Sequence, residues 1–338
     1  MRRGEGDSLL PPRPGDRRSV MGRDSTAGFP LAVSMGMPVR NGGPLLSEAL
    51  ASLLAQTHRD FELIISDNAS TDETADLCRA AADRDSRVRY DRSEVNAGAV
   101  ANFNRVLSLA RGEFFMWAAS DDVWHPRFVE SLCGLLRASP GAVLAFCSFN
   151  NIDEKGRGIR EYPDLAGLMA DDQGTRLSRF LAQPEHLGKA NLIYGMTRRQ
   201  ALVDAGGFTL WSERDWGVDM LAVFRLLSMG QLVLTHELLF HKRLLSAAPS
   251  PVRIPEALSS GLGRWREDLL DRQAYFFGYR KLISMTEGLS PEQRETLCGI
   301  ARARARQVRR EAWRGLRHTA NRKLMVTLRR MAFLDRAL

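Results

Sequence analysis

Short apolar runs alternate with stretches of helical apolar spacing along the first half of the chain. Residues 31–37 are mostly apolar and stop at Pro38, which predicts a buried strand. Leucines then recur at helical intervals through residues 45–56, and a second apolar run follows at 61–66. The same patterns predict further strands at 88–91, 114–118 and 142–149, and further helices at 70–82, at 99–110 and from Pro126 onward.

This regular alternation of strand and helix predicts an α/β fold, in which a doubly wound, mostly parallel sheet is flanked by helices. Ligands of such sheets bind beyond the carboxyl ends of the strands. Polar residues follow four of the predicted strands at this edge, at 38–41, 67–68, 96–104 and 121–122. Ser70 and Glu73 have the spacing of a capping box, so we expect the Ser70 side chain to accept a hydrogen bond from the Glu73 amide.

The composition is that of a folded protein, with 338 residues of which 44% are hydrophobic and 26% charged. No apolar run approaches the roughly 18 residues that cross a bilayer. The four cysteines lack a CxxC or Cys/His cluster, which argues against a zinc site or a disulfide framework and fits a cytoplasmic protein. Residues 1–29 are rich in Arg, Gly and Pro without apolar periodicity, so we expect them to be disordered.

The positive charge is concentrated at the C-terminal end. Residues 301–338 contain 12 Lys and Arg against two acidic residues, a net charge of +10, so the first 300 residues of this +8 chain carry −2. Within residues 297–334, apolar residues recur at helical intervals and arginines point in other directions, which predicts an Arg-rich amphipathic helix. Peripheral contact with an anionic membrane and packing on the rest of the chain are the two main interpretations, and nucleic-acid binding is the least favoured.

Acidic residues that could bind a metal ion or a ligand follow two of the predicted strands. Asp121 and Asp122 follow an apolar run, and their hard oxygen ligands suit Mg²⁺ or Mn²⁺ completed by phosphate oxygens. The alternative for Asp122 is that it caps the next helix. Asp67 could accept a hydrogen bond from the imide N–H of a uracil or thymine, or could equally be a cap. The GxGxxG and GxxxxGK[ST] motifs are absent from the sequence, which weakens a dinucleotide-oxidoreductase or P-loop interpretation.

A collinear set of short blocks resembles the family 2 glycosyltransferases, which have the GT-A fold. The blocks are residues 38–41, 52–57, 60–62, 66–74, 96–98, 102–104, 110–114 and 120–122, followed by Asp219 with Arg225 and Gly230. The resemblance covers about residues 31–243. It implies a GT-A-like domain at 30–245, with a nucleotide-sugar-binding half at 30–150 and an acceptor half at 151–245, and it leaves 246–338 as a helical C-terminal extension.

The resemblance also implies roles for single residues. By similarity, Asp67 binds the base, Asp121 holds the metal on the diphosphate, and Asp219 is the catalytic base. The other residues expected at the nucleotide are Pro38, Asn41, Asn68, Asn96, Gly98 and Asn102. Independently of the family, Asp219 opens a helical stretch at 218–229 whose apolar side packs inward, so its carboxylate can face a cleft. The alternative is a carboxylate that is favoured there by the helix dipole.

The sequence departs from the family pattern in two places. Ala119 stands where the first Asp of an Asp-x-Asp motif is usual, so metal binding must depend on Asp121, with Asp122 as a second candidate ligand. Val218 stands where a Glu often precedes the base, and Asp215, four residues before Asp219, is the second candidate for that role.

Aromatic and basic residues near these acids have less certain assignments. Trp124, Trp211 and Trp216 are either walls for a sugar or acceptor or core residues. His241, Lys242 and Arg243 either bind the departing diphosphate or form a solvated charged run.

These observations together predict a metal-dependent, inverting glycosyltransferase. It would move a sugar from a nucleoside-diphosphate sugar, most simply a UDP-sugar, to an acceptor hydroxyl in polysaccharide, lipid-linked glycan or glycolipid assembly of the cell envelope. Its expected place is the cytoplasm or the inner face of the membrane. A sugar nucleotidyltransferase and a non-catalytic nucleotide-sugar-binding partner are the alternatives.

Overall fold

The computed structural model describes residues 31–162, 165–210, 215–245 and 261–319. In the last of these ranges it describes the side chains of residues 270–310 only. The segment predicted to be disordered, Trp211, and the chain beyond residue 319 lie outside the described residues.

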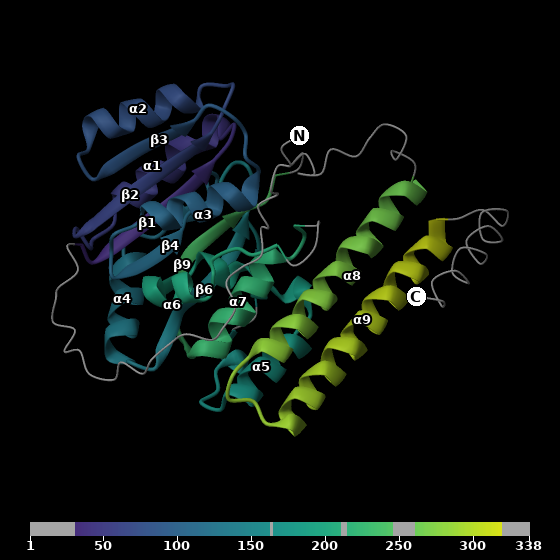
Figure 1. Ribbon diagram of the computed structural model, residues 1–338. Coiled ribbons are helices and arrows are strands. Elements are labelled where there is room, and N and C mark those ends of the chain that lie inside the picture. The colour runs from purple at the N-terminus through teal and green to yellow at the C-terminus, as the bar shows by residue number, and fades with distance from the viewer. Residues whose placement is uncertain (1–30, 163–164, 211–214, 246–260, 320–338) are drawn as a thin grey trace, which may run out of the picture.

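A nine-stranded sheet forms the centre of the described molecule (Figure 1). The strands run in the order β3-β2-β1-β4-β8-β6-β9-β5, and β7 pairs with β6 at one side. Neighbouring strands are parallel between β3 and β4, and β6 is parallel to β9, whereas β5, β7 and β8 pair antiparallel with their neighbours. The predicted α/β fold with a mostly parallel sheet is therefore confirmed. The strands are β1 (Val33–Val39), β2 (Phe61–Asn68), β3 (Val88–Ser93), β4 (Phe114–Trp117), β5 (Val123–Trp124), β6 (Ala142–Ile152), β7 (Gly158–Glu161), β8 (Met196–Arg198) and β9 (Gln231–Arg243).

Helices flank the sheet, as the alternation of patterns predicted (Figure 1). The α-helices are α1 (Leu46–Leu54), α2 (Thr74–Arg84), α3 (Ala99–Leu109), α4 (Phe128–Ala138), α5 (Gln173–Ala182), α6 (Arg199–Asp204), α7 (Val218–Met229), α8 (Gly261–Met285) and α9 (Pro291–Thr319). Short 3-10 turns lie at Gly43–Leu45, Leu165–Leu168, Glu185–Leu187 and Lys189–Tyr194.

The expected capping box at Ser70 is wrong. Helix α2 begins only at Thr74, its N-cap residue is Glu73 without a capping side chain, and the Thr74 amide donates to the Asp72 Oδ1 at 3.1 Å. Ser70 instead accepts a hydrogen bond from the Asn41 amide at 2.9 Å. The hydroxyl thus joins the ends of β1 and β2, a tertiary contact that the local sequence pattern does not contain.

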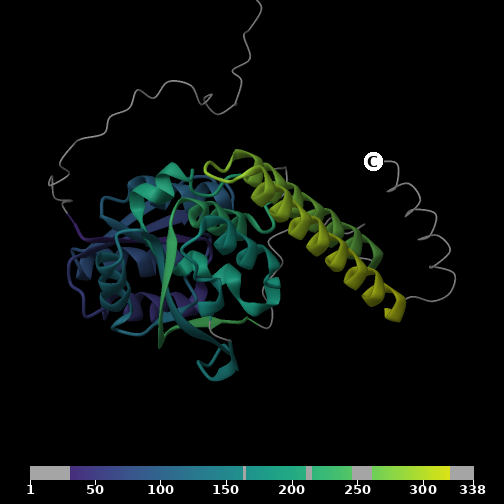
Figure 2. The same cartoon turned by 90° about the horizontal axis from the view of Figure 1, so that it is seen from below.

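The C-terminal extension is a pair of antiparallel helices, α8 and α9, that lie side by side and project beyond the sheet (Figures 1 and 2). Helix α8 packs on α7, where the buried ring of Tyr279 lies 5.1 Å from Phe224, and α9 packs on α5. None of the described helices combines the length and the apolar character that crossing a membrane requires.

A buried ionic contact attaches α9 to the rest of the protein. Arg304 donates to the Glu185 carboxylate at 2.6 Å, and the Nζ of Lys189 lies 3.6 Å from the same carboxylate. Burial lowers the pKa of Lys189 to about 8, which Glu185 opposes. Lys189 also donates to the carbonyls of Phe180 and Gln183, so this buried ammonium is hydrogen-bonded at several points.

Removing Arg304 should therefore destabilise the protein. We expect Arg304→Ala to lower the free energy of unfolding by about 3 kcal/mol, because it leaves Glu185 in a partly buried site without its arginine. Arg310 is exposed on the same helix, and Arg310→Ala is the matched control, with an expected change below about 0.5 kcal/mol. Urea unfolding followed by circular dichroism measures both, and equal values for the two variants would contradict the structural role of Arg304.

Candidate functional site

The loops after β1 and β2 are joined through Asp67 and Asn41. The Asp67 carboxylate is fully buried, where it accepts from the Ser70 amide at 2.8 Å and from the Tyr90 hydroxyl at 2.7 Å. Asn41 has a positive φ of 53°, which asparagine tolerates, and its Oδ1 accepts from the Thr71 amide at 2.9 Å. Asp67 is thus built into its own loop in this structure and presents no exposed oxygen to a base.

The loop before α3 is held by a second set of amide hydrogen bonds. Asn68 donates to Asn96 at 2.8 Å and to the Gly98 carbonyl at 3.1 Å. Asn102 is buried in α3 and donates to the backbone of Ser66 at 2.9 Å, which ties this helix to the end of β2. With Pro38 at the end of β1, the structure gathers all seven residues predicted for nucleotide binding at the carboxyl edge of β1 and β2. Most of their polar side-chain atoms stabilise the loops themselves.

Asp121 and Asp122 are adjacent but have different environments. Asp122 is fully buried, and its carboxylate accepts from the Lys242 ammonium at 3.0 and 3.2 Å and from the Arg243 amide at 2.9 Å. The Asp121 side chain is half-buried and has no hydrogen bond or ion pair with any described residue. Of the two predicted metal ligands, Asp121 is therefore the one with a carboxylate available to a ligand.

Burial raises the pKa of Asp122 to about 6, although Lys242 and the Arg243 amide lower it. The carboxylate is thus ionised at neutral pH. Burial alone would lower the pKa of Lys242, but Tyr194, Asp122 and Asp121 outweigh burial and raise it above its usual range. The pair is therefore a charged ion pair in which each residue holds the other in place.

The other basic residues at the end of β9 are also engaged. Arg243 donates to the Asp121 carbonyl at 2.8 Å, to the Asp153 carbonyl at 2.8 Å and to Glu48 at 2.6 Å, and its side chain is buried. The Nδ1 of His241 lies 2.7 Å from the Asn150 Oδ1. Arg243 therefore fixes the loop that carries Asp121, and of the three basic residues predicted at a diphosphate only Lys242 lies close to the acids with part of its side chain exposed.

The ring of Tyr194 is influenced by the charges of several of these residues. Burial, with the charges of Asp122, Asp121 and Asp219, raises the pKa of Tyr194 to about 12, although Lys242 lowers it. The Lys242 ammonium lies 5.0 Å from the centre of the Tyr194 ring. Residues from the β4–β5 loop, the end of β9 and the start of α7 thus act on one side chain. The sequence analysis did not identify Tyr194, because its surroundings between residues 150 and 195 carry no recognisable motif.

Asp219 lies in the first turn of α7, where its Oδ1 accepts from the Met220 amide at 2.7 Å. Burial raises its pKa, and the backbone hydrogen bonds and Lys242 partly oppose this. Asp215, the second candidate for the base, is exposed in the turn before α7. A carboxylate with a raised pKa in a partly buried position is the better proton acceptor of the two.

Two of the three predicted tryptophans are described, and they differ. Trp124 is 2% exposed and packs on Phe240 at 5.7 Å between ring centres, so it is a core residue that presents no surface to a sugar. Trp216 is partly exposed next to Asp215 and meets the edge of Tyr275 at 5.1 Å. Only Trp216 is placed where it could contact a substrate.

Within the described ranges, no three His, Cys, Asp or Glu side chains lie close enough together to hold a metal ion unaided. The donor set here is one unpaired carboxylate, Asp121. This fits Mg²⁺ or Mn²⁺ only as ions that keep water and take further oxygens from a bound diphosphate.

The two adjacent acids should respond differently to loss of charge. We expect Asp122→Asn to lower the free energy of unfolding by about 3 kcal/mol, because it removes the partner of a cation that is held in a buried ion pair. Asp121→Asn is the matched control and should change it by less than about 0.5 kcal/mol. Thermal and urea unfolding of both variants measures this, and a larger loss for Asp121→Asn would reverse the assignment.

Part of this chain is similar to known proteins. The glycosyl transferase family 2 profile matches residues 34–192. An uncharacterized glycosyltransferase of Rickettsia prowazekii is 30% identical over 38% of this chain and 39% of its own length. A putative teichuronic acid biosynthesis glycosyltransferase of Bacillus subtilis, TuaG, is 29% identical over 46% of this chain and 54% of its own length. This chain therefore aligns with only about two fifths to one half of these curated relatives.

Solved structures agree with the fold. Residues 1–349 of TarS from S. aureus, in complex with UDP-GlcNAc, superpose with a TM-score of 0.55 at 16% identity, covering 86% of this chain and 93% of that one. At this identity the likeness concerns the fold alone. The family profile, which spans the strand ends that carry Asp67 and Asp121, confirms the resemblance found in the sequence: residues 34–192 match glycosyl transferase family 2.

Proposed function

We propose that this protein is a metal-dependent, inverting glycosyltransferase that uses a UDP-sugar as donor. The observation that carries the proposal is the unpaired carboxylate of Asp121 next to the Asp122–Lys242 ion pair, together with the electrostatic influence of Asp121, Asp219 and Lys242 on Tyr194. One carboxylate there is unpaired, a second has a raised pKa, and a cation lies beside them. This combination suits the three tasks of holding a metal, accepting a proton and balancing a diphosphate.

The donor would lie across the carboxyl edge of β1 and β2. Hydrogen bonds hold these loops together: the Asn41 amide donates to the Ser70 hydroxyl, the Ser70 amide donates to the Asp67 carboxylate, and the Asn102 side chain donates to the Ser66 carbonyl. A rigid loop loses little entropy when it binds a nucleotide. The fold likeness to TarS in its complex with UDP-GlcNAc supports a uridine nucleotide as the donor class.

Asp219 would remove the proton from the acceptor hydroxyl as its oxygen attacks the anomeric carbon. The bond from that carbon to the diphosphate oxygen would break ahead of attack, which gives an oxocarbenium-like transition state, and attack from the face opposite the diphosphate would invert the configuration. Mg²⁺ or Mn²⁺ at Asp121 would neutralise the charge that develops on the diphosphate. Lys242 keeps its proton because of its raised pKa, so it adds a fixed positive charge nearby.

The acceptor class is inferred from one relative and one side chain. The resemblance to TuaG, whose name refers to teichuronic acid biosynthesis, favours an acceptor in polysaccharide or lipid-linked glycan assembly. Trp216, partly exposed near Asp219, offers an aromatic face for such a sugar.

Loss of the base should separate chemistry from binding. We expect Asp219→Asn to lower kcat at least about 1,000-fold while the Kd for UDP changes little, because only proton transfer is lost. Asp215→Asn, which removes an exposed carboxylate four residues away, is the control and should keep near-normal kcat. UDP release and calorimetric titration with UDP measure the two quantities.

The pH dependence of kcat/KM in the unsubstituted protein is a second test of Asp219 as the base. Since the base must be ionised and burial raises its pKa, kcat/KM should fall with decreasing pH at a pKa above the usual aspartate value. Near-normal turnover by Asp219→Asn would remove Asp219 from the mechanism. Release of pyrophosphate in place of UDP would indicate a nucleotidyltransferase.

Loss of the free carboxylate should remove the effect of metal. We expect Asp121→Asn to bind UDP with the same weak affinity in Mn²⁺ and in EDTA, whereas the unsubstituted protein should bind about 10-fold more tightly in Mn²⁺. The comparison needs no turnover, so it tests metal binding directly. A retained response to Mn²⁺ in Asp121→Asn would show that other groups hold the ion.

A further inference from the structure

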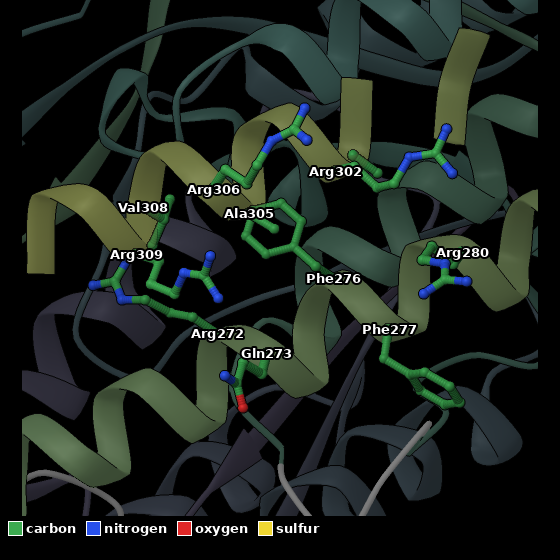
Figure 3. A pocket seen from close by; sticks show the side chains of 11 residues that line it. Arg272, Gln273, Phe276, Phe277, Arg280, Arg302, Ala305, Arg306, Val308 and Arg309 are labelled. Carbon is green, nitrogen blue, oxygen red and sulfur yellow. The ribbon is translucent and has the colours of Figure 1, made fainter. Parts of the chain in front are cut away.

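A pocket of about 350 Å³ lies between α8 and α9, away from the acids described above (Figure 3). Among the residues whose side chains the structure describes, five arginines and no acidic residue line it; the arginines are Arg272 and Arg280 from α8 and Arg302, Arg306 and Arg309 from α9. Figure 3 shows their guanidinium groups placed around the ring of Phe276. A concave site with several cations and no lining acid favours an anionic occupant.

Helix α9 presents two chemically different faces. Arg302, Arg306 and Arg309 are spaced at i, i+4 and i+7, so they share one side, and all three are exposed. The structure records no acidic partner for any of the three among the described residues. Arg304, by contrast, faces the body and is paired with Glu185. Because the packing of α9 already uses Arg304, the exposed arginines are not needed to attach the helix.

Apolar side chains accompany these cations. Phe276 is 7% exposed and forms part of the pocket wall, so its faces are not free to stack on a base. Phe277, at the rim of the pocket, is 54% exposed, and Met285 farther along α8 is 50% exposed. Cations that suit phosphate next to exposed apolar side chains match the boundary between the headgroups and acyl chains of a lipid layer.

We propose that the pocket between α8 and α9 binds the phosphate of an anionic phospholipid and places this pair of helices on a membrane surface. This goes beyond the transfer reaction and does not depend on it. The planar arginine fork matches phosphate oxygens bidentately, and each cation near an anionic surface contributes about 1 kcal/mol. The pocket is a compact site on a helical pair that projects beyond the sheet (Figure 2), a shape that suits one headgroup better than the extended backbone of a nucleic acid.

Co-flotation of the full chain with vesicles tests the proposal. The test vesicles contain phosphatidylcholine with one third phosphatidylglycerol, and the reference vesicles contain phosphatidylcholine alone. We expect binding to the anionic vesicles only, and a roughly 100-fold weaker partition coefficient for the triple variant Arg302→Gln, Arg306→Gln and Arg309→Gln. Phe277→Ser should weaken binding to a smaller extent and mainly at high salt, where the charges are screened.

A matched control removes the same charge elsewhere. A second triple variant changes three exposed arginines outside the pocket, Arg59→Gln, Arg84→Gln and Arg310→Gln. It should retain most of the binding to anionic vesicles. If both triple variants lost vesicle binding equally, the overall positive charge and not the pocket would be responsible, and the proposal would be overturned. Unchanged binding in the pocket variant would overturn the proposal outright, as would equal binding to both kinds of vesicle. If the pocket variant lost binding to a single-stranded oligonucleotide but not to vesicles, the site would be a nucleic-acid site and the proposal would be wrong. Circular dichroism confirms that both variants fold.

Discussion

The buried ion pair between Asp122 and Lys242 is the contact on which the site depends. It joins the loop after β4 to the end of β9, two segments about 120 residues apart in the chain. The Arg243 amide adds a third hydrogen bond to the same carboxylate, and the Arg243 side chain holds the backbone of Asp121. A buried ion pair contributes little net stability, but removing one partner is costly, so the pair fixes one geometry. Because Asp122 is committed to that geometry, its neighbour Asp121 is left with a carboxylate that no described residue uses.

The same division between support and chemistry appears at the nucleotide loops. Asp67, Asn68 and Asn102 are buried or nearly so, and their polar atoms bind the backbone of neighbouring loops. These residues therefore stabilise the loops at the carboxyl edge of β1 and β2, and a ligand would bind to loops whose conformation is already set. A binding site needs such support, because side chains that contact a ligand orient it well only when neighbouring residues hold them in place. The exposed residues of this edge are held by buried ones: Asn96 accepts from Asn68, and the Asn41 amide donates to Ser70.

Local pattern predicted the alternating half of the fold well, because each buried parallel strand is a short apolar run and its end is marked by polar residues. It could not separate Asp121 from Asp122, since the choice is made by Lys242 and Arg243, which only the folded sheet brings near. It could not place Trp124 either. The position of Trp124 close to acidic residues in the sequence suggests the wall of a sugar site, but its backbone pairs with Phe240 in the core. The expected cap at Ser70 failed for the same reason, because a tertiary partner, Asn41, takes the hydroxyl. Strands β5, β7 and β8 are too short, and β9 too mixed in character, for a periodic signal to define them.

Helix α8 connects the candidate base to the basic pocket. One side of α8 supports the start of α7: the Tyr275 ring packs against Gly217, which has a positive φ of 78°, and its hydroxyl lies 3.3 Å from the sulfur of Met220, next to Asp219. A side chain at position 217 would collide with that ring, so the close packing there requires glycine. An adjacent side of the same helix carries Arg272, which lies over Trp216 and also lines the pocket. A movement of α8 toward a bound lipid would therefore displace the surface on which the turn before Asp219 rests. The helical extension is in this sense part of the site that it adjoins, since the position of the candidate base depends on helix α8, and both lie outside the residues that the family profile covers.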